Sequence, residues 1–190
     1  MKFVQKEFSC TIEEKKSKFI AFLMPYSMFD EVMARLRTEH PKARHFVYAY
    51  RYLNEFDQIV ENSSDDGEPK GTSAKPSLAV MAGNELINTA VIIVRYFGGI
   101  KLGTGGLVRA YGDSVNEVIK NASFKEYQKL MEKTLVFDYA ELSKLEYLLN
   151  QENINIISKE FDSQINLKIE LTNEQFELLK TLLSRNISLL

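Results

Sequence analysis

The sequence has little of what marks secreted or membrane proteins. Cys10 is the only cysteine, so no disulfide can form within the chain. The apolar run from Ala90 to Val94 is far too short to span a bilayer, and the N-terminal stretch lacks the apolar segment of a signal peptide. We therefore expect a cytoplasmic protein with no membrane partner.

Glycine and proline are absent from the C-terminal part of the chain. All nine glycines lie between Gly67 and Gly112, all four prolines precede them or lie among them before residue 80, and the last 78 residues contain neither type. Such a shift in composition indicates two architectural units. We predict a first domain over residues 1–124 and a second over residues 125–190.

Hydrophobic periodicity predicts an α+β fold in both domains. The β-branched, apolar stretch Thr89–Tyr96 predicts a central strand that is buried on both faces. In the second domain, the order of elements is most of a ferredoxin-like βαββαβ plan, with only a short tail over 187–190 for the last strand. The other predicted strands lie at 17–24, 44–52, 58–61, 134–139, 154–161 and 165–171, and the predicted helices at 28–39, 76–82, 107–120, around 142–149, and after a capping box formed by Thr172 and Gln175.

The most distinctive segment is RYFGGIKLGTGGLVRAYG, Arg95 to Gly112, which joins a predicted strand to a predicted helix. Glycines in such a loop let the backbone approach a ligand, and the N-terminus of the following helix favours an anion. The segment matches neither the Walker A nor the GxGxxG pattern, so a tight structural crossover is the alternative. The predicted phosphate or nucleic-acid site consists of Arg95, Lys101, Arg109, Lys70, Lys75, Gly98, Gly99, Gly103, Gly105 and Gly106.

An acidic loop precedes this segment. Asp65, Asp66 and Glu68 carry the oxygen ligands that Mg²⁺ prefers, although no EF-hand pattern is present. The same carboxylates could instead pair with Lys70, Lys75, Arg95 or Arg109 and hold the glycine loop in place. A dry pair with Arg95 or Arg109 would make the acidic loop structural.

Aromatic residues offer a further mode of binding. Tyr48, Tyr50, Tyr96 and Phe97 could stack on nucleic-acid bases. Aromatic side chains on strands more often belong to the core, and both readings stay open at this point.

Two long motifs resemble the signature of the IMPACT/YigZ family. These are DDGEPKGTSAKP, residues 65–76, and VIIVRYFGGIKLGTGGLVRAYG, residues 91–112, and the HFVYAY and SKFIA stretches also fit. The resemblance implies a first domain like the second domain of S5-type ribosomal proteins, and a second domain like the ferredoxin-like final domain of elongation factor G. The sequence departs from the family pattern at Lys70 and at Ser73-Ala74. Eukaryotic members of that family regulate translation by binding an activator of the amino-acid-starvation kinase.

These observations favour a translation-associated regulatory protein that binds RNA, or a ribosome or translation-factor surface, through the basic glycine loop. One alternative is an Mg²⁺-dependent enzyme acting on a phosphorylated small molecule, with Asp65, Asp66 or Glu68 holding the ion. Another is a protein-interaction module without ligand chemistry. We assign no catalytic residue, and Mg²⁺ enters as a cofactor only under the enzyme alternative.

Overall fold

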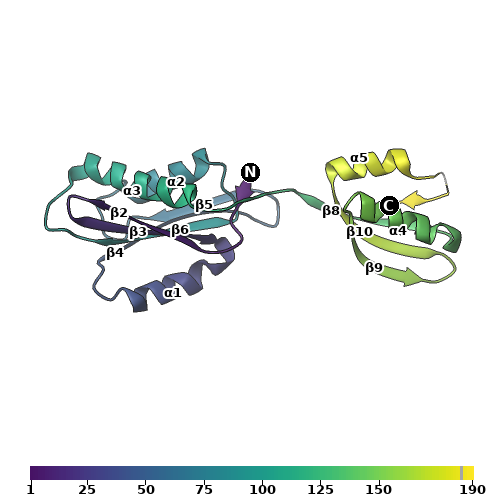
Figure 1. Ribbon diagram of the computed structural model, residues 1–190, viewed down its shortest axis with the longest axis horizontal. Coiled ribbons are helices and arrows are strands. Elements are labelled where there is room, and N and C mark those ends of the chain that lie inside the picture. Colours follow the sequence, from purple (N-terminus) through teal and green to yellow (C-terminus); the bar gives the residue numbers. More distant parts are fainter. Residues whose placement is uncertain (185) are drawn as a thin grey trace. The chain divides into compact units, whose positions relative to one another are not determined.

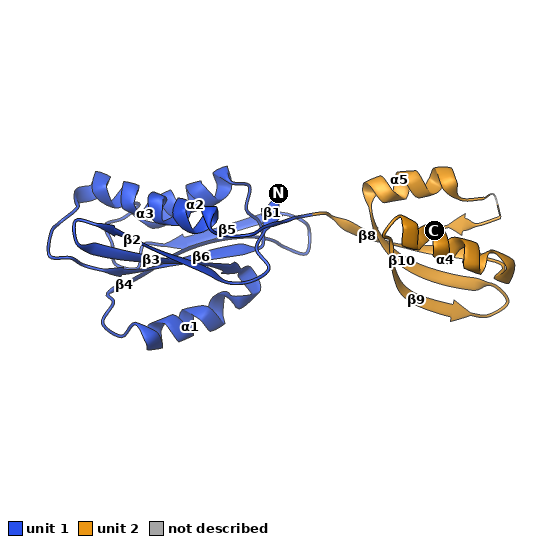
Figure 2. Cartoon of the chain, in the orientation of Figure 1, with its two compact units in different colours: residues 1–127 blue, residues 128–190 orange. Residues whose placement is uncertain are grey.

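The computed structural model describes residues 1–184 and 186–190 and consists of two compact units, residues 1–127 and 128–190 (Figures 1 and 2). Each unit mixes helices and strands, as the sequence predicted. The first unit ends after Tyr127 rather than at residue 124, because strand β7 (Lys125–Glu126) pairs with β1 (Lys2–Phe3).

Unit 1 is built on a five-stranded sheet whose neighbouring strands are all antiparallel. Every residue of the middle strand β6 except Tyr96 is buried, which confirms the predicted central strand. The edge strand β2 has no counterpart among the predicted strands, because its alternation of half-buried and exposed residues is a weak signal. In spatial order, the strands are β2 (Phe8–Glu14), β3 (Ser17–Pro25), β6 (Thr89–Tyr96), β4 (His45–Leu53) and β5 (Ile59–Ser64).

Helices cover both faces of this sheet (Figure 1). A 3-10 turn at Tyr26–Met28 leads into α1 (Phe29–Glu39) on one face, while α2 (Ala74–Gly83) and α3 (Gly103–Lys120) pack against each other on the opposite face. Two apolar layers result, one including Phe19, Met81 and Tyr111 beneath α2 and α3, and one including Leu36, Phe46 and Ile92 beneath α1.

The start of α3 differs from the expectation. The helix begins at Gly103, so Gly103, Gly105 and Gly106 lie in its first turn and not in the preceding loop. The low helix propensity of glycine, roughly 1 kcal/mol below alanine, hid this start from the sequence pattern. The predicted apolar stripe of Leu107 and Tyr111 is confirmed, and both side chains are buried.

Unit 2 has the predicted βαββαβ order, with a four-stranded sheet in the order β11-β8-β10-β9. The predicted capping box is present, since Thr172 Oγ1 accepts a hydrogen bond from Gln175 N and Gln175 Oε1 accepts one from Thr172 N. No helix in the described part of either unit is long and apolar enough to cross a membrane. The elements are β8 (Leu130–Phe137), a 3-10 turn (Tyr139–Glu141), α4 (Leu142–Gln151), β9 (Asn155–Phe161), β10 (Ile165–Thr172), α5 (Asn173–Leu182) and β11 (Ser188–Leu189).

Candidate functional site

Gly98 anchors the glycine segment to the tip of the β2–β3 hairpin. A Cβ atom at this position would lie 2.0 Å from the carbonyl carbon of Lys16 and 2.3 Å from the backbone nitrogen of Ser17. The Gly98 N–H donates a 3.1 Å hydrogen bond to Ser17 Oγ. Gly98 is therefore required by close backbone packing.

The remaining glycines of the segment have more room. Gly99 and Gly103 have φ angles of +85° and +73°, which side-chain-bearing residues rarely adopt, and a Cβ at either would meet no atom within 4 Å. The Leu102 backbone lies in the right-handed helical region directly before Gly103. A residue with right-handed helical backbone angles, followed by one with left-handed angles, turns successive N–H groups toward one side. The resulting concavity attracts anions.

The Arg95 side chain, which the sequence predicted to contact phosphate, is buried against the acidic loop. Its Nη1 donates a 2.5 Å hydrogen bond to Glu68 Oε1, and the two side chains are only 7% and 3% exposed. The Tyr111 hydroxyl donates to the same oxygen at 2.8 Å. Burial, together with the Glu68 carboxylate, raises the pKa of Tyr111, so the hydroxyl stays protonated as a donor. The acidic loop and the glycine segment thus meet in a dry ion pair.

The other two carboxylates of the acidic loop also serve the fold. Asp65 accepts hydrogen bonds from the backbone N–H groups of Gly71, Ser73 and Ala74 and from the Ser73 hydroxyl, at 2.6 to 3.1 Å. It therefore caps α2 from outside the helix, where the N-cap Ser73 makes no side-chain cap of its own. Asp66 Oδ2 accepts a 2.6 Å hydrogen bond from Phe46 N.

These contacts weigh against Asp65, Asp66 and Glu68 as magnesium ligands, which only the enzyme alternative requires. Each carboxylate accepts hydrogen bonds from protein donors, and the three carboxylates have different donors. Within residues 1–184 and 186–190, no group of three His, Cys, Asp or Glu side chains is arranged to hold a metal ion. At least one oxygen of each carboxylate accepts a hydrogen bond from a protein donor.

Asp65 gives the acidic loop a dependence on pH. Its burial alone would raise its pKa, but the hydrogen bonds from Gly71, Ser73 and Ala74 outweigh burial and hold the pKa below its ordinary value of 3.8. A carboxyl with a lowered folded pKa stabilises the fold above its unfolded pKa, and this stability is lost as the pH falls through the folded value.

We expect Asp65→Asn to lower the free energy of unfolding at neutral pH by about 1–2 kcal/mol, because it removes a charged helix cap. The variant should also lose less stability than the wild type between pH 5 and pH 2, in urea denaturation. Asp113→Asn, at an exposed position of α3, is the control. Identical pH profiles for both variants would refute this role of Asp65.

A cavity of about 400 Å³ opens where β6 ends and α3 begins, and we call it the α3 cavity. Its exposed cations, Arg44 and Lys101, form no ion pair with any described residue. No acidic residue stands in the first turn of α3, and Leu102 provides no side-chain cap. The positive end of the helix dipole and its free N–H groups are thus left for an anion. The lining residues are Arg44, His45, Glu68, Pro69, Arg95, Phe97, Lys101, Leu102, Gly103, Thr104 and Leu107.

His45 has a fixed orientation at this cavity. Its Nδ1 lies 2.9 Å from the carbonyl oxygen of Asp66, which can only accept, so Nδ1 carries a proton. Its Nε2 lies 3.9 Å from Glu68 Oε1. The pairing of β4 with β6 places His45 opposite Arg95 and thereby brings Arg44 and His45 to the cavity. That pairing, which the sequence pattern did not contain, is why both residues were missing from the predicted site.

The cations of the predicted site lie at different places in the structure. Lys101 lines the α3 cavity, whereas Arg109 lines a smaller cavity of about 270 Å³ with the acidic residues Glu13, Glu14 and Asp113. Lys70 and Lys75 are exposed and are not among the residues that line the α3 cavity. The predicted cations therefore do not all line the same cavity.

The aromatic residues predicted to stack on bases also lie at different places in the structure. Tyr48 and Tyr50 are half-buried and pack edge-on against Phe29 of α1. The Tyr96 hydroxyl lies 2.9 Å from His40 Nδ1. Only Phe97, whose side chain is 54% exposed, lines the α3 cavity.

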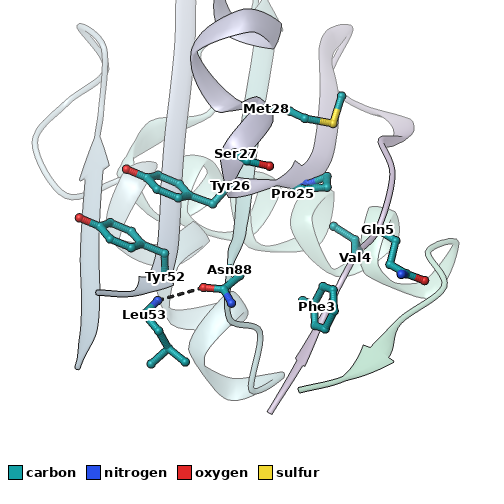
Figure 3. Close-up of a pocket in the computed structure, with 10 residues that line it drawn as sticks. All are labelled: Phe3, Val4, Gln5, Pro25, Tyr26, Ser27, Met28, Tyr52, Leu53 and Asn88. Carbon is teal, nitrogen blue, oxygen red and sulfur yellow. Dashed lines mark hydrogen bonds between the residues drawn. The ribbon is translucent and has the colours of Figure 1, made fainter. Parts of the chain in front are cut away.

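A larger cavity of about 640 Å³ lies elsewhere in unit 1, between the N-terminal segment and the ends of β3 and β4 (Figure 3). Tyr26 and Tyr52 stack in parallel on its wall, with ring centroids 4.2 Å apart. None of the described residues that line it is charged. This cavity therefore offers an anion no electrostatic attraction, and the α3 cavity is the better candidate.

Fold and site together define a two-unit α+β protein with a cavity at the start of α3 that is lined by Arg44 and Lys101. Residues 15–119 match the model of the Impact N-terminal domain, and residues 135–186 match a domain of unknown function, DUF1949. The chain belongs to the IMPACT family, as the resemblance of its motifs implied.

Several relatives are similar over both units. The chain is 38% identical over 162 residues to the IMPACT family member YigZ of Escherichia coli, covering 84% of this chain and 79% of that protein. It is 36% identical over 171 residues to an IMPACT family member of Haemophilus influenzae, covering 87% and 82%. A crystal structure of a hypothetical protein, 33% identical, covers all of this chain and 95% of that one with a TM-score of 0.66.

Proposed function

We propose that this protein is a translation-associated regulator that binds RNA, or a ribosomal surface that presents RNA, at the α3 cavity. The observation that carries the proposal is the combination of an uncapped helix start with the unpaired cations Arg44 and Lys101. Free N–H groups and cations together are the donors that nucleic-acid phosphates recruit. Membership of the IMPACT family supports the link to translation, since the family resemblance implies such a role.

The β2–β3 hairpin adds charge to the proposed surface. The Lys16 backbone touches Gly98, and the exposed Lys15, Lys16 and Lys18 outnumber the exposed Glu13 and Glu14 by one charge. Lys18 pairs with Tyr96 in the β3–β6 register, so the hairpin tip borders the end of β6. A phosphate chain leaving the cavity along this edge would meet further cations.

The carboxylates argue against the enzyme alternative. An Mg²⁺-dependent phosphoryl enzyme needs oxygen ligands that are open to a cation. Here Glu68 is held by Arg95 and Tyr111, and Asp65 is held by the backbone of the α2 start. The acidic loop is better described as the support of the cavity wall.

We expect Lys101→Glu to weaken the binding of labelled tRNA or ribosomes by about tenfold, because it replaces an attraction with a repulsion at the cavity rim. The dependence of log K on log salt should also fall by about one unit for the variant. Fluorescence anisotropy over a series of KCl concentrations measures both quantities.

Lys144→Glu makes the same change of charge at an exposed position in unit 2 and is the matched control. It should reduce affinity by less than about twofold. Equally weak binding by the wild type and Lys101→Glu would overturn the proposal.

A further inference from the structure

The buried Arg95 carries an unused donor at the wall of the α3 cavity. Its Nη1 is bound to Glu68, yet its Nε is buried and has no hydrogen-bond partner among residues 1–184 and 186–190. The Arg95 side chain is 7% exposed and lines the cavity together with Gly103 and Thr104. Buried guanidinium donors are normally satisfied, so Arg95 retains one donor for which the described residues supply no acceptor.

The helix start supplies a second set of donors on the same cavity. Gly103 and Thr104 stand in the first turn of α3, where backbone N–H groups have no partner inside the helix. Lys101 and Arg44 lie on the rim with no ion pair to a described residue. One end of the cavity therefore suits a compact, doubly charged oxyanion such as a phosphate.

The remaining wall is apolar and carries an aromatic face. Phe97 is 54% exposed and stands near Leu102 and Leu107 in the cavity lining. The Arg95 guanidinium carbon lies 5.8 Å from the centre of the Phe97 ring, which helps to hold that ring beside the anion end. An exposed ring next to a phosphate site is the arrangement in which a nucleobase stacks while its own phosphate is bound.

We infer that the α3 cavity binds one unstacked nucleotide, with its phosphate at the start of α3 and its base against Phe97. The volume of about 400 Å³ lies within the range of small-ligand sites. This inference rests on the proposed function and narrows it, because an RNA delivers an unstacked base from a single-stranded region and not from a paired stem. A fully paired stem keeps its bases stacked and contacts the protein through its backbone alone.

The test compares three ligands with the full chain. A short 3′-labelled oligouridine should bind more tightly than a fully paired hairpin of equal length, in anisotropy titrations at one salt concentration. Uridine 5′-monophosphate should compete with the oligouridine, whereas uridine, which lacks the phosphate, should not. Addition of the monophosphate should shift the amide NMR signals of Gly103 and Thr104.

Two matched variants locate the base. Phe97→Leu keeps an apolar side chain but removes the ring, and should weaken oligouridine binding about tenfold while changing hairpin binding less than about twofold. Phe56→Leu makes the same change at a ring that is 71% exposed in the β4–β5 turn and should change neither affinity. Circular dichroism of each variant checks that the fold is retained.

The possible failures are distinguishable. Equal affinities for oligouridine and hairpin, with Phe97→Leu behaving like Phe56→Leu, would overturn the nucleotide pocket and leave the proposed RNA binding in place. Binding of the free monophosphate that depends on Phe97, without binding of either RNA, would support the pocket and overturn the proposed function. Binding of none of these ligands would overturn both.

Discussion

Gly98→Ala should destabilise unit 1 by about 4 kcal/mol, a large fraction of the stability of a domain of this size. The added Cβ would lie 2.0 Å from the Lys16 carbonyl carbon and 2.2 Å from its oxygen, and both are backbone atoms. Relief requires a shift of the β2–β3 hairpin away from the end of β6, where it is held by the β3–β6 ladder. We expect the midpoint of thermal unfolding to fall by roughly 10–20 °C.

Gly105→Ala is the control within the same segment. Gly105 lies in the first turn of α3, and a Cβ there would meet no atom within 4 Å. Alanine restricts the unfolded chain and favours helix, so this variant should be more stable than the wild type by about 0.5–1 kcal/mol. Differential scanning calorimetry on both variants measures the contrast. Our account of Gly98 fails if its replacement changes the midpoint no more than that of Gly105.

Arg95→Met should lower the free energy of unfolding by about 3–5 kcal/mol, because it leaves a carboxylate buried without its cation. Glu68 is 3% exposed at the side chain, and the Tyr111 hydroxyl would remain as its one hydrogen-bond donor among the described residues. Chemical denaturation at pH 7 measures the loss.

A double-mutant cycle separates the pair from its surroundings. Glu68→Gln alone should also destabilise, while Glu68→Gln combined with Arg95→Met should be more stable than the sum of the two losses predicts. Arg35→Met is a matched control, because its partner Glu7 lies in an exposed pair worth about 1 kcal/mol or less. A loss in Arg95→Met that is no larger than in Arg35→Met would contradict a buried, structural pair.

These two predictions concern the support of the α3 cavity. Gly98 fixes the loop against the hairpin, and the Arg95–Glu68 pair fixes the acidic loop against β6. The donors left without a described partner at the cavity are Lys101, Arg44, Arg95 Nε and the start of α3. Lys101 has no part in the support of the cavity, so a binding variant such as Lys101→Glu should unfold like the wild type.

The sequence by itself determined the elements whose signal is local. Thr89–Tyr96 is a continuous apolar, β-branched run, which only a strand buried on both faces explains. The Thr172–Gln175 capping box and the alternation of β10 defined unit 2, because side-chain period and cap chemistry depend on near neighbours. The two long motifs were enough to identify the IMPACT family, which the match over residues 15–119 shows.

Only the tertiary structure decided which charges are free. Arg95 and Lys101 are equivalent in the sequence, as cations of one glycine-rich segment, yet Arg95 is buried against Glu68 while Lys101 is exposed. Two arginines were also placed differently by the sequence and by the structure. The β4–β6 register brings Arg44, which the predicted site lacked, to the α3 cavity, whereas Arg109 of the predicted site lines a different cavity. The physical reason is that these contacts join residues far apart in the chain. Strand pairing and the partners of a buried carboxylate are both of this kind, and local periodicity carries no information on them.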